Sequence, residues 1–492
     1  MKKVISFLAV LVLLVSCLSF SVAEEKVTLR YAMPLGPGAG LEEGVKAVNE
    51  KMAADGLNIE LEVIVIPFSS YSEKVTAMFA AGQPLDIIYI MQDQRNIGSF
   101  VGDDMIMPID DLLKNYPALE GLYTEQQWGA STYNGSRYAV PAVWKDFSKI
   151  YGDLTTRSDI IEKHFDGKYP TDTEELYEYL KAMQAIMEKE TGTKAYMWLQ
   201  SLNESADFLS RTYDSWPFYV DKNNSLLLFR QDGTIESYFE SEEFKMAANY
   251  FRRLYTEGLI HPDIINENQN RNSYAYVGSF LPSPTFNYDL QNTIVAQVPE
   301  AKIELFYLAP EKIKLVSQIT MNMNAVSSTS EHPEKVIEFF DWLYADQDNF
   351  DSFYLGIEGV HYNLTDEGRV EYINDASGTA LYKMPAWVCG NLKLNRFGTS
   401  YTEKGIQYDN IPLPADQVVY SPMLNFVFDS APVEMELINL TQEVTATLLP
   451  IKLGMVDYEE NIGPAIEKLK AAGLDAYIAE YQRQLDAFRG VK

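Results

Sequence analysis

SYSEKVTAMFAAGQPLDIIYI, residues 70–90, contains the signals of a helix, a tight turn and a buried strand in succession. Ser70 and Glu73 have the S-x-x-E spacing of a capping box, Gly82 ends the helical pattern, and Pro84 prevents the helix from resuming. DIIYI (86–90) is apolar at every position after its aspartate, which is typical of a central parallel strand covered on both faces. The side chains expected to form the buried stripe of the helix are Tyr71, Val75, Met78 and Phe79.

The residues before this segment extend the pattern toward the N-terminus. VTLRYAMP (27–34) and IELEVIVIPF (59–68) predict strands, and the apolar spacing of 40–56 predicts a helix between them. The order is therefore strand, helix, strand, helix, strand, which indicates an open α/β lobe. Ligands of such sheets bind beyond the carboxyl ends of the strands. The segments expected there are PLGPGAG (34–40), PFSSY (67–71) and MQDQ (91–94).

The rest of the chain alternates helix signals with irregular regions. At 492 residues it is too long for one ordinary core, so two or more lobes are expected. Residues 365–435 look irregular, with scattered proline and glycine. Further helices are predicted at 173–190, 242–257, 333–345 and 475–488, and a further strand at 317–328.

Charge and aromatic content restrict the function. The chain has 40 Lys and Arg against 70 Asp and Glu, and removing residues 1–23 with two lysines would leave 38 − 70 = −32. Such a surface disfavours nucleic acid and anionic lipid as partners. The 32 Tyr, 24 Phe and 6 Trp include rings that can stack on the flat faces of sugars.

The N-terminus has the layout of a secretory signal, with two lysines before an apolar run. LVSC (14–17) resembles a lipobox, so we expect a lipoprotein anchored through Cys17 on the extracellular face of the membrane. The alternative is cleavage after Ala23, which would release a soluble form. Because Cys17 lies in the leader, Cys389 has no intrachain disulfide partner and is expected to be small and partly buried.

No motif for catalysis, metal or cofactor is convincing. GPGAG (36–40) lacks the third glycine of the dinucleotide fingerprint, and none of the P-loop, zincin, calcium-loop or nucleophile-elbow patterns occurs. Glu358 and His361 in GIEGVHY (356–362) could form an acid–base pair, but we favour a structural role because no nucleophile accompanies them. We expect no cofactor, no metal and no catalytic residue.

Several segments resemble the carbohydrate-binding proteins of ABC importers, the family that includes maltose-binding protein. DIIYIMQDQ with MIMPIDDLL (105–113) is similar to the third strand and the segment after it. YNGSRYAVP (133–141) is similar to the turn before the first crossover. YPTDTEELYEYLKAM (169–183) and MNAVSSTSEHPEKVIEFFDWLYAD (323–346) are similar to a lobe-two helix and to the return into lobe one. GIEGVHY and the ending LKAAGLDAYIAEYQRQLDAF resemble a branch of large lipoproteins.

The resemblance implies a type II, two-lobed α/β fold. Each lobe would be an open mixed sheet flanked by helices, with the ligand cleft at the hinge. Lobe one would comprise 24–142 and 316–355, and lobe two 143–315 and 356–492. The protein would be a monomer that captures an oligosaccharide by lobe closure and delivers it to ABC transporter permease subunits. An extracellular carbohydrate-acting enzyme, an adhesin, or a binding protein for a non-sugar solute such as peptide remains the alternative.

The resemblance also indicates site residues. Asp93 matches a sugar-binding aspartate of the maltose-type relatives, whereas their neighbouring arginine is Gln94 here and their crossover acid aligns with Lys145. Sugars need planar polar partners for their hydroxyls and rings for their apolar faces. The expected ligand-binding residues are Asp93, Gln92 and Lys145 as polar partners, Trp387, Trp216 and Tyr71 as rings, and Glu358 and Asn391 beside them.

Overall fold

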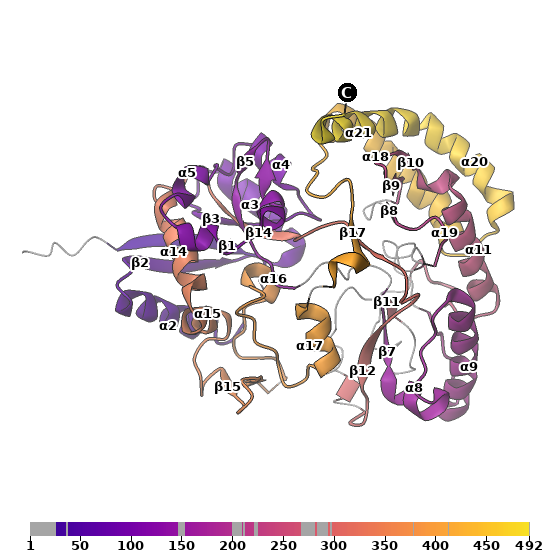
Figure 1. The fold of residues 1–492 in the computed structure, drawn as a ribbon, viewed down its shortest axis with the longest axis horizontal. Coiled ribbons are helices and arrows are strands. Elements are labelled where there is room, and N and C mark those ends of the chain that lie inside the picture. Colours follow the sequence, from indigo (N-terminus) through magenta and orange to yellow (C-terminus); the bar gives the residue numbers. More distant parts are fainter. Residues whose placement is uncertain are drawn as a thin grey trace, which may run out of the picture.

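The chain folds into two bodies that lie side by side, lobe one and lobe two, seen in the computed structural model (Figure 1). Lobe one contains the N-terminal strands, and lobe two contains the long C-terminal helices. None of the helices in the described part of the chain has both the length and the apolar character that a bilayer span requires. The structure describes residues 26–35, 38–145, 153–198, 209, 212–220, 225–266, 281–282, 294–295, 298–376, 378–411 and 413–491.

Lobe one is built on a five-stranded mixed sheet in the order β2-β1-β3-β14-β6. β1 is parallel to both β2 and β3, whereas β14 is antiparallel to β3 and to β6. Helices α2 and α3 connect the parallel strands, so the predicted strand–helix–strand–helix–strand order is confirmed. The bounds are β1 Val27–Met33, α2 Leu41–Ala54, β2 Ile59–Val65, α3 Tyr71–Ala80, β3 Ile87–Met91, β6 Ala139–Pro141 and β14 Asn322–Val326.

β3 is the central strand that its apolar sequence predicts. Every residue from Ile87 to Ile90 is fully buried, because helices cover both faces of the sheet at this strand. The capping box is wrong, since Ser70 makes no side-chain cap and its hydroxyl donates to the Pro67 carbonyl oxygen at 3.3 Å. Ser70 instead ends a short 3₁₀ turn, η1 (Phe68–Ser70), that precedes α3.

Shorter elements complete lobe one. The return strand β14 leads into α14 and α15, which pack against each other; α14 also contacts β1, and α15 contacts α2. Trp342, on the apolar face of α14, is buried as its position predicts. The further bounds are α4 Ile97–Gly102, α5 Asp110–Leu113, α6 Pro117–Glu120, α7 Glu125–Gly129, β4 Thr132–Tyr133, β5 Ser136–Arg137, α14 Pro333–Ala345 and α15 Gln347–Tyr354.

Lobe two is mainly helical in its described residues. Its two three-stranded sheets, β10-β9-β8 and β11-β7-β12, are antiparallel and smaller than the mixed sheet we expected. The strands are β7 Asp153–Arg157, β8 Phe218–Val220, β9 Leu227–Arg230, β10 Ile235–Ser237, β11 Leu281–Pro282 and β12 Ile303–Tyr307. The helices are α8 Ser158–Phe165, α9 Thr173–Thr191, η3 Tyr238–Glu240, α11 Glu242–Thr256, α17 Glu403–Asn410, η5 Ala431–Val433, α18 Glu434–Glu443, the π-helical η6 Val444–Leu448, α19 Leu449–Lys452, α20 Tyr458–Ala471 and α21 Leu474–Arg489.

The boundary expected at residue 356 differs from the packing. Residues that follow α15, including Tyr382, Val388 and Cys389, are buried in the core of lobe one rather than of lobe two. The Tyr344 hydroxyl donates to the Cys389 carbonyl oxygen at 3.0 Å, and Asn324 Nδ2 donates to the Val388 oxygen at 2.9 Å. Lobe one therefore also includes the segment that follows α15, up to about residue 394. The elements here are β15 Tyr362–Leu364, β16 Val370–Tyr372 and α16 Ala386–Cys389.

The chain segments that run between the lobes are hydrogen-bonded to one another. Ala142 N donates to the Asn322 carbonyl oxygen at 2.9 Å, and the Trp144 indole N–H donates to Asn322 Oδ1 at 3.1 Å. Asn395 Nδ2 donates to the Trp144 carbonyl oxygen at 2.7 Å. The segments around residues 142–145, 320–322 and 392–395 thus form one hydrogen-bonded bundle. Nearby, β13 (Lys314–Val316) pairs in parallel with β17 (Val418–Tyr420), which follows η4 (Ala415–Gln417).

Candidate functional site

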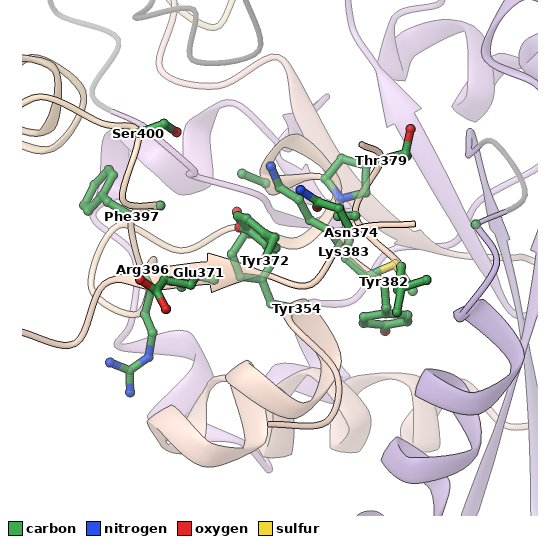
Figure 2. Close-up of a pocket in the computed structure, with 18 of the residues that line it drawn as sticks. Tyr354, Glu371, Tyr372, Asn374, Thr379, Tyr382, Lys383, Arg396, Phe397 and Ser400 are labelled. Atoms are coloured by element: carbon green, nitrogen blue, oxygen red, sulfur yellow. The ribbon is translucent and has the colours of Figure 1, made fainter. Parts of the chain in front are cut away.

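A cavity of about 1140 Å³ lies on lobe one, at the bundle between the lobes. Its walls come from the loop after β1, from Trp144, and from residues 370–401 (Figure 2). Aromatic rings contribute much of the lining, and the described polar side chains are interspersed with them. The aromatic lining residues are Trp144, Tyr354, Tyr372, Tyr382, Trp387, Phe397 and Tyr401, and the polar ones include Glu371, Asn374, Thr379, Lys383, Asn395, Arg396, Thr399 and Ser400.

The loop after β1 forms part of the wall, as the position of residues 34–40 predicts. Leu35 and Gly38 line the cavity, and Gly40 N donates to the Leu381 carbonyl oxygen at 2.8 Å. A Cβ on Gly40 would lie 2.8 Å from that oxygen and 2.9 Å from His361 Nε2. Glycine is therefore required in GPGAG for close packing of two chain segments.

His361 supports this wall from inside. It is 1% exposed, its Nδ1 accepts a hydrogen bond from Ile357 N at 3.0 Å, and its Nε2 lies 3.8 Å from Glu43 Oε2. Burial lowers the pKa of His361, so the neutral imidazole is favoured. Glu358 is exposed on the adjoining turn. These contacts support the structural role that we favoured over an acid–base pair.

Among the described residues, two cationic side chains line the cavity. Lys383 is half-buried, with Nζ 4.8 Å from the centre of the Tyr372 ring, and burial lowers its pKa to about 8. Arg396 instead donates from Nε to Asp351 Oδ2 at 2.6 Å, and its guanidinium points away from the other lining side chains (Figure 2).

An aromatic group connects the cavity to the carboxyl ends of β2 and β3. Trp387 lies 5.9 Å from the ring of Phe68 and 5.6 Å from that of Tyr89, and the Tyr89 hydroxyl donates to the Trp387 carbonyl oxygen at 2.7 Å. Phe68 is 50% exposed in the segment 67–71 that sequence reasoning selected. Burial raises the pKa of Tyr89, and the exposed Asp93 adds to this increase through its negative charge. Asp93, Phe68 and Trp387 are therefore brought into one region.

The side chains of Gln92 and Tyr71 make hydrogen bonds inside lobe one. Gln92 Oε1 accepts from Ile97 N at 2.7 Å, and its Nε2 donates to the Ala130 carbonyl oxygen at 3.3 Å. Tyr71 is 1% exposed, and its hydroxyl donates to the Ala32 oxygen and accepts from Tyr89 N. The role of Tyr71 as a ligand-stacking ring is therefore wrong for this structure, and its place in the buried stripe of α3 is confirmed.

Lys145 and Asn391 are both 4% exposed, so neither is placed to contact a ligand as expected. Lys145 Nζ lies 5.0 Å from the centre of the Trp144 ring, and Asn391 Oδ1 accepts from Lys393 N at 3.0 Å. Asn391 thereby stabilises the turn after α16. Lys145 belongs to the bundle between the lobes, and Asn391 directly precedes one of its segments; both side chains are packed inside the protein rather than toward the cavity.

Trp216 belongs to lobe two. Its indole N–H donates to the Ile313 carbonyl oxygen at 2.6 Å, and its ring packs edge-on against Phe218 at 5.7 Å. It is half-buried against the lobe-two core and does not line the cavity. Cys389 is fully buried, and burial raises the pKa of its thiol, so it is a packing residue. Cys17, expected to carry a lipid, lies outside the described residues.

Sequence reasoning missed most of the cavity wall. Tyr372, Lys383 and Phe397 lie in the region that showed no helical or strand periodicity. The available signal was the density of rings and small polar residues in YKMPAW (382–387) and RFGTSY (396–401). Within the described residues, no cluster of three or more histidine, cysteine, aspartate or glutamate side chains could hold a metal ion.

Comparison with protein families matches residues 35–349 to the model described as bacterial extracellular solute-binding protein. The chain belongs to this family. The match covers most of lobe one and the part of lobe two between the first and second crossovers, and the family is described as extracellular solute-binding proteins. Residues 422–490 of this solute-binding protein match a second model, a domain of unknown function (DUF3502), which covers helices α18 to α21.

Two curated relatives resemble the solute-binding protein in sequence. A carbohydrate ABC transporter substrate-binding protein of Streptococcus pneumoniae is 22% identical over 452 residues, which cover 90% of this chain and 86% of the relative. The polygalacturonan/rhamnogalacturonan-binding protein YtcQ of Bacillus subtilis is 22% identical over 326 residues, covering 62% of this chain and 61% of the relative. The resemblance found in the sequence motifs is thereby confirmed.

Solved structures confirm the type II two-lobed fold of the solute-binding protein. The N-glycan transport solute binding protein NgtS of Streptococcus pneumoniae aligns with a TM-score of 0.75 at 18% identity, over 94% of this chain and 99% of that one. An HMO-binding, ABC-transporter-associated solute-binding protein of Bifidobacterium longum infantis aligns with a TM-score of 0.63 at 14% identity, over 95% of this chain and 100% of that one.

Proposed function

We propose that this solute-binding protein captures an oligosaccharide at the aromatic cavity and delivers it to an ABC importer. The observation that carries the proposal is the ring-rich lining of the cavity, continuous through Trp387 with the half-exposed Phe68. Rings of this kind cover the apolar faces of sugars, while hydroxyl, amide and charged groups bind the sugar hydroxyls. The relatives named for carbohydrate transport and binding support the same class of ligand.

Within this proposal, Asp93 and the rings at the ends of β2 and β3 hold the sugar on lobe one. Lobe two then closes over it about the hydrogen-bonded bundle at residues 142–145, 320–322 and 392–395. Trp216 is the aromatic residue from lobe two that we assign to the closed state. Its half-buried ring and its position near the crossover support this assignment.

The same proposal includes the cellular setting. The mature protein is a monomer without cofactor or catalytic activity, lipid-anchored through Cys17 outside the cell membrane, and its protein partners are permease subunits. The secretory signal, the LVSC sequence and membership of an extracellular family support this setting. Cleavage after Ala23 would give a soluble form instead, which mass spectrometry of the mature N-terminus distinguishes from a lipidated Cys17.

The test is a melting screen over neutral and acidic mono- and oligosaccharides, followed by calorimetric titration of each hit. A saccharide that binds only the folded state at 100 times its Kd adds about 2.7 kcal/mol of stability, which raises the melting temperature. Each hit is also incubated with the protein and analysed for products. Cleaved sugar identifies an enzyme, and binding of peptides but of no saccharide identifies a non-sugar binding protein. Either result overturns the proposal.

A further inference from the structure

We propose that three buried side chains of lobe one position the ring of Trp387 for sugar binding. They are those of Tyr89, Asn324 and Tyr344, which bind the short helix α16 from its core side and which we call the clamp. The inference rests on the proposed function and assigns to these residues an effect on the ligand that acts only through Trp387. All three are buried in lobe one, so they cannot touch a ligand themselves.

Helix α16 depends on contacts with the rest of lobe one for its position. It comprises only the four residues Ala386–Cys389, and a helix this short is not stable without tertiary contacts. No side chain caps its N-terminus, and Gly390 after it is extended. Gly390 N donates to the Ala386 carbonyl oxygen at 2.6 Å, which leaves the three carbonyl groups that follow for partners outside the helix.

The clamp supplies one hydrogen bond to each of these carbonyl oxygens. In chain order, the oxygens of residues 387–389 accept from the Tyr89 hydroxyl at 2.7 Å, from Asn324 Nδ2 at 2.9 Å and from the Tyr344 hydroxyl at 3.0 Å. The donors lie on β3, β14 and α14, so three elements of lobe one converge on a single helical turn. Burial raises the pKa of both phenols, which therefore stay protonated donors at neutral pH.

These bonds fix the backbone that carries Trp387. A movement of α16 would break one or more of them and leave a buried carbonyl group without a partner, which is unfavourable. The Trp387 ring, which lines the cavity, also contacts two other rings. Its centre lies 5.6 Å from that of the buried Tyr89 and 5.9 Å from that of the half-exposed Phe68. The core side of the ring is thus held while its other neighbour lies at the surface.

The orientation of the ring affects affinity because a sugar face stacks on a ring only when the two planes can meet. Without one clamp donor, α16 gains positions in which the unpaired carbonyl group reaches water. The apparent affinity falls with the fraction of molecules whose ring is in place, so a fraction of about a third to a tenth raises the Kd about three- to tenfold.

The first experiment needs no ligand and follows the ring itself. Tyr344→Phe removes a clamp hydroxyl at the Cys389 carbonyl oxygen and keeps its own ring, which packs on phenylalanine rings of the lobe-one core. The protein is labelled with fluorotryptophan, and Trp387→Phe assigns the Trp387 signal among the six tryptophans. We expect this fluorine resonance to shift or split in Tyr344→Phe.

The matched control is Tyr250→Phe, which removes a hydroxyl that donates to the Thr173 carbonyl oxygen at 3.1 Å in lobe two. It should leave the Trp387 resonance unchanged. Tyr89→Phe, which keeps the ring contact with Trp387, is the second clamp variant if melting shows that Tyr344→Phe is poorly folded. A Trp387 resonance that is the same in the parent and in the folded clamp variants would overturn the inference.

The second experiment measures affinity by calorimetry with maltotetraose, mannotetraose, chitotetraose, trigalacturonate and kestose, and continues with the probe that binds most tightly. Tyr344→Phe should raise its Kd about three- to tenfold, whereas Tyr250→Phe should change it less than about twofold. In a Trp387→Ala background, Tyr344→Phe should also change the Kd less than about twofold, because the ring that the clamp positions is absent.

The two backgrounds separate positioning from general support of the fold. If Tyr344→Phe weakens binding equally with and without Trp387, or does not weaken it in the parent, the inference is wrong although the protein still binds sugar. If the parent binds none of the probes, the proposed function fails, while the fluorine resonance still decides whether the clamp holds the ring.

Discussion

Replacing Gly44 by alanine tests how α2 supports the cavity. A Cβ at this position would lie 2.3 Å from Tyr382 Cε2, while ordinary contacts begin near 3.4 Å, so the two groups must separate by 3.4 − 2.3 = 1.1 Å. Tyr382 is 3% exposed and its hydroxyl donates to the Phe353 carbonyl oxygen at 2.7 Å. The ring therefore cannot withdraw without disturbing the core.

The magnitude follows from these contacts. Overpacking costs about 1–3 kcal/mol, and losing the Tyr382 hydrogen bond costs about 0.5–1.5 kcal/mol. Alanine also gains about 1 kcal/mol over glycine in a helix. Gly102, at the end of α4, is the control, because a Cβ there would meet no atom within 4 Å and no proline follows it. The helix gain is up to about 1 kcal/mol smaller at a helix end, so Gly44→Ala should be about 0.5–4.5 kcal/mol less stable than Gly102→Ala.

The assay is urea unfolding of the two variants and the parent, followed by fluorescence and by circular dichroism. Coincident transitions permit comparison of midpoints at a shared slope, and separate lobe transitions are compared lobe by lobe. In a Tyr382→Ala background the methyl group has room, and Gly44→Ala should there be no worse than Gly102→Ala. Equal stability of Gly44→Ala and Gly102→Ala in the parent background would refute the reasoning.

Three further predictions concern single residues. Asp93→Ala should weaken oligosaccharide binding by roughly 1.5–3 kcal/mol and change stability by less than about 0.5 kcal/mol, because the side chain is exposed at a strand end; unchanged affinity in calorimetry would remove Asp93 from the site. Trp387→Ala should weaken binding at least tenfold, about 1.4 kcal/mol, and cost less stability than the 3–5 kcal/mol of a fully buried aromatic, because the ring is half-buried; a larger loss of stability without loss of affinity would make it a core residue. His361→Gln removes a group whose folded pKa is lowered by burial, so the stability that neutral His361 contributes is present above its unfolded pKa of about 6.5 and is lost as pH falls below it. The stability advantage of the parent over His361→Gln should therefore shrink between pH 7.5 and pH 5, and an advantage that grows on acidification would contradict this account.

Local signals predicted the first lobe well. The apolar run at 86–90 predicted a central strand, and the spacing in 40–56 and 333–345 placed the ends of α2 and α14 within two residues of those observed. For Tyr71, the prediction from the helical pattern was correct and the prediction of a ligand contact was not. Its position in the helical stripe predicted burial, whereas its position near a strand end suggested a ligand contact that the structure excludes.

The cavity wall could not be predicted in the same way. Its geometry depends on contacts between residues far apart in the chain, such as Gly40 with His361 and Gly44 with Tyr382. Neither glycine has a local sequence signal for its partner, and residues 370–401 follow no regular period. The burial of Lys145 and Asn391 likewise depends on how segments from different parts of the chain converge, which residue spacing does not encode.

The placement of β14 has a consequence for how the chain matures. It fills the position between β3 and β6, pairing Asn322 with Met91 and Met323 with Pro141, so the sheet stays in two pieces until more than 320 residues are present. Closing loops of such length is slow, because chain entropy is lost before the contacts form. A chain leaving the ribosome therefore carries an incomplete first sheet for most of its synthesis. A sheet without β14 buries less apolar surface, so lobe one should reach its full stability only after this strand has joined β3 and β6.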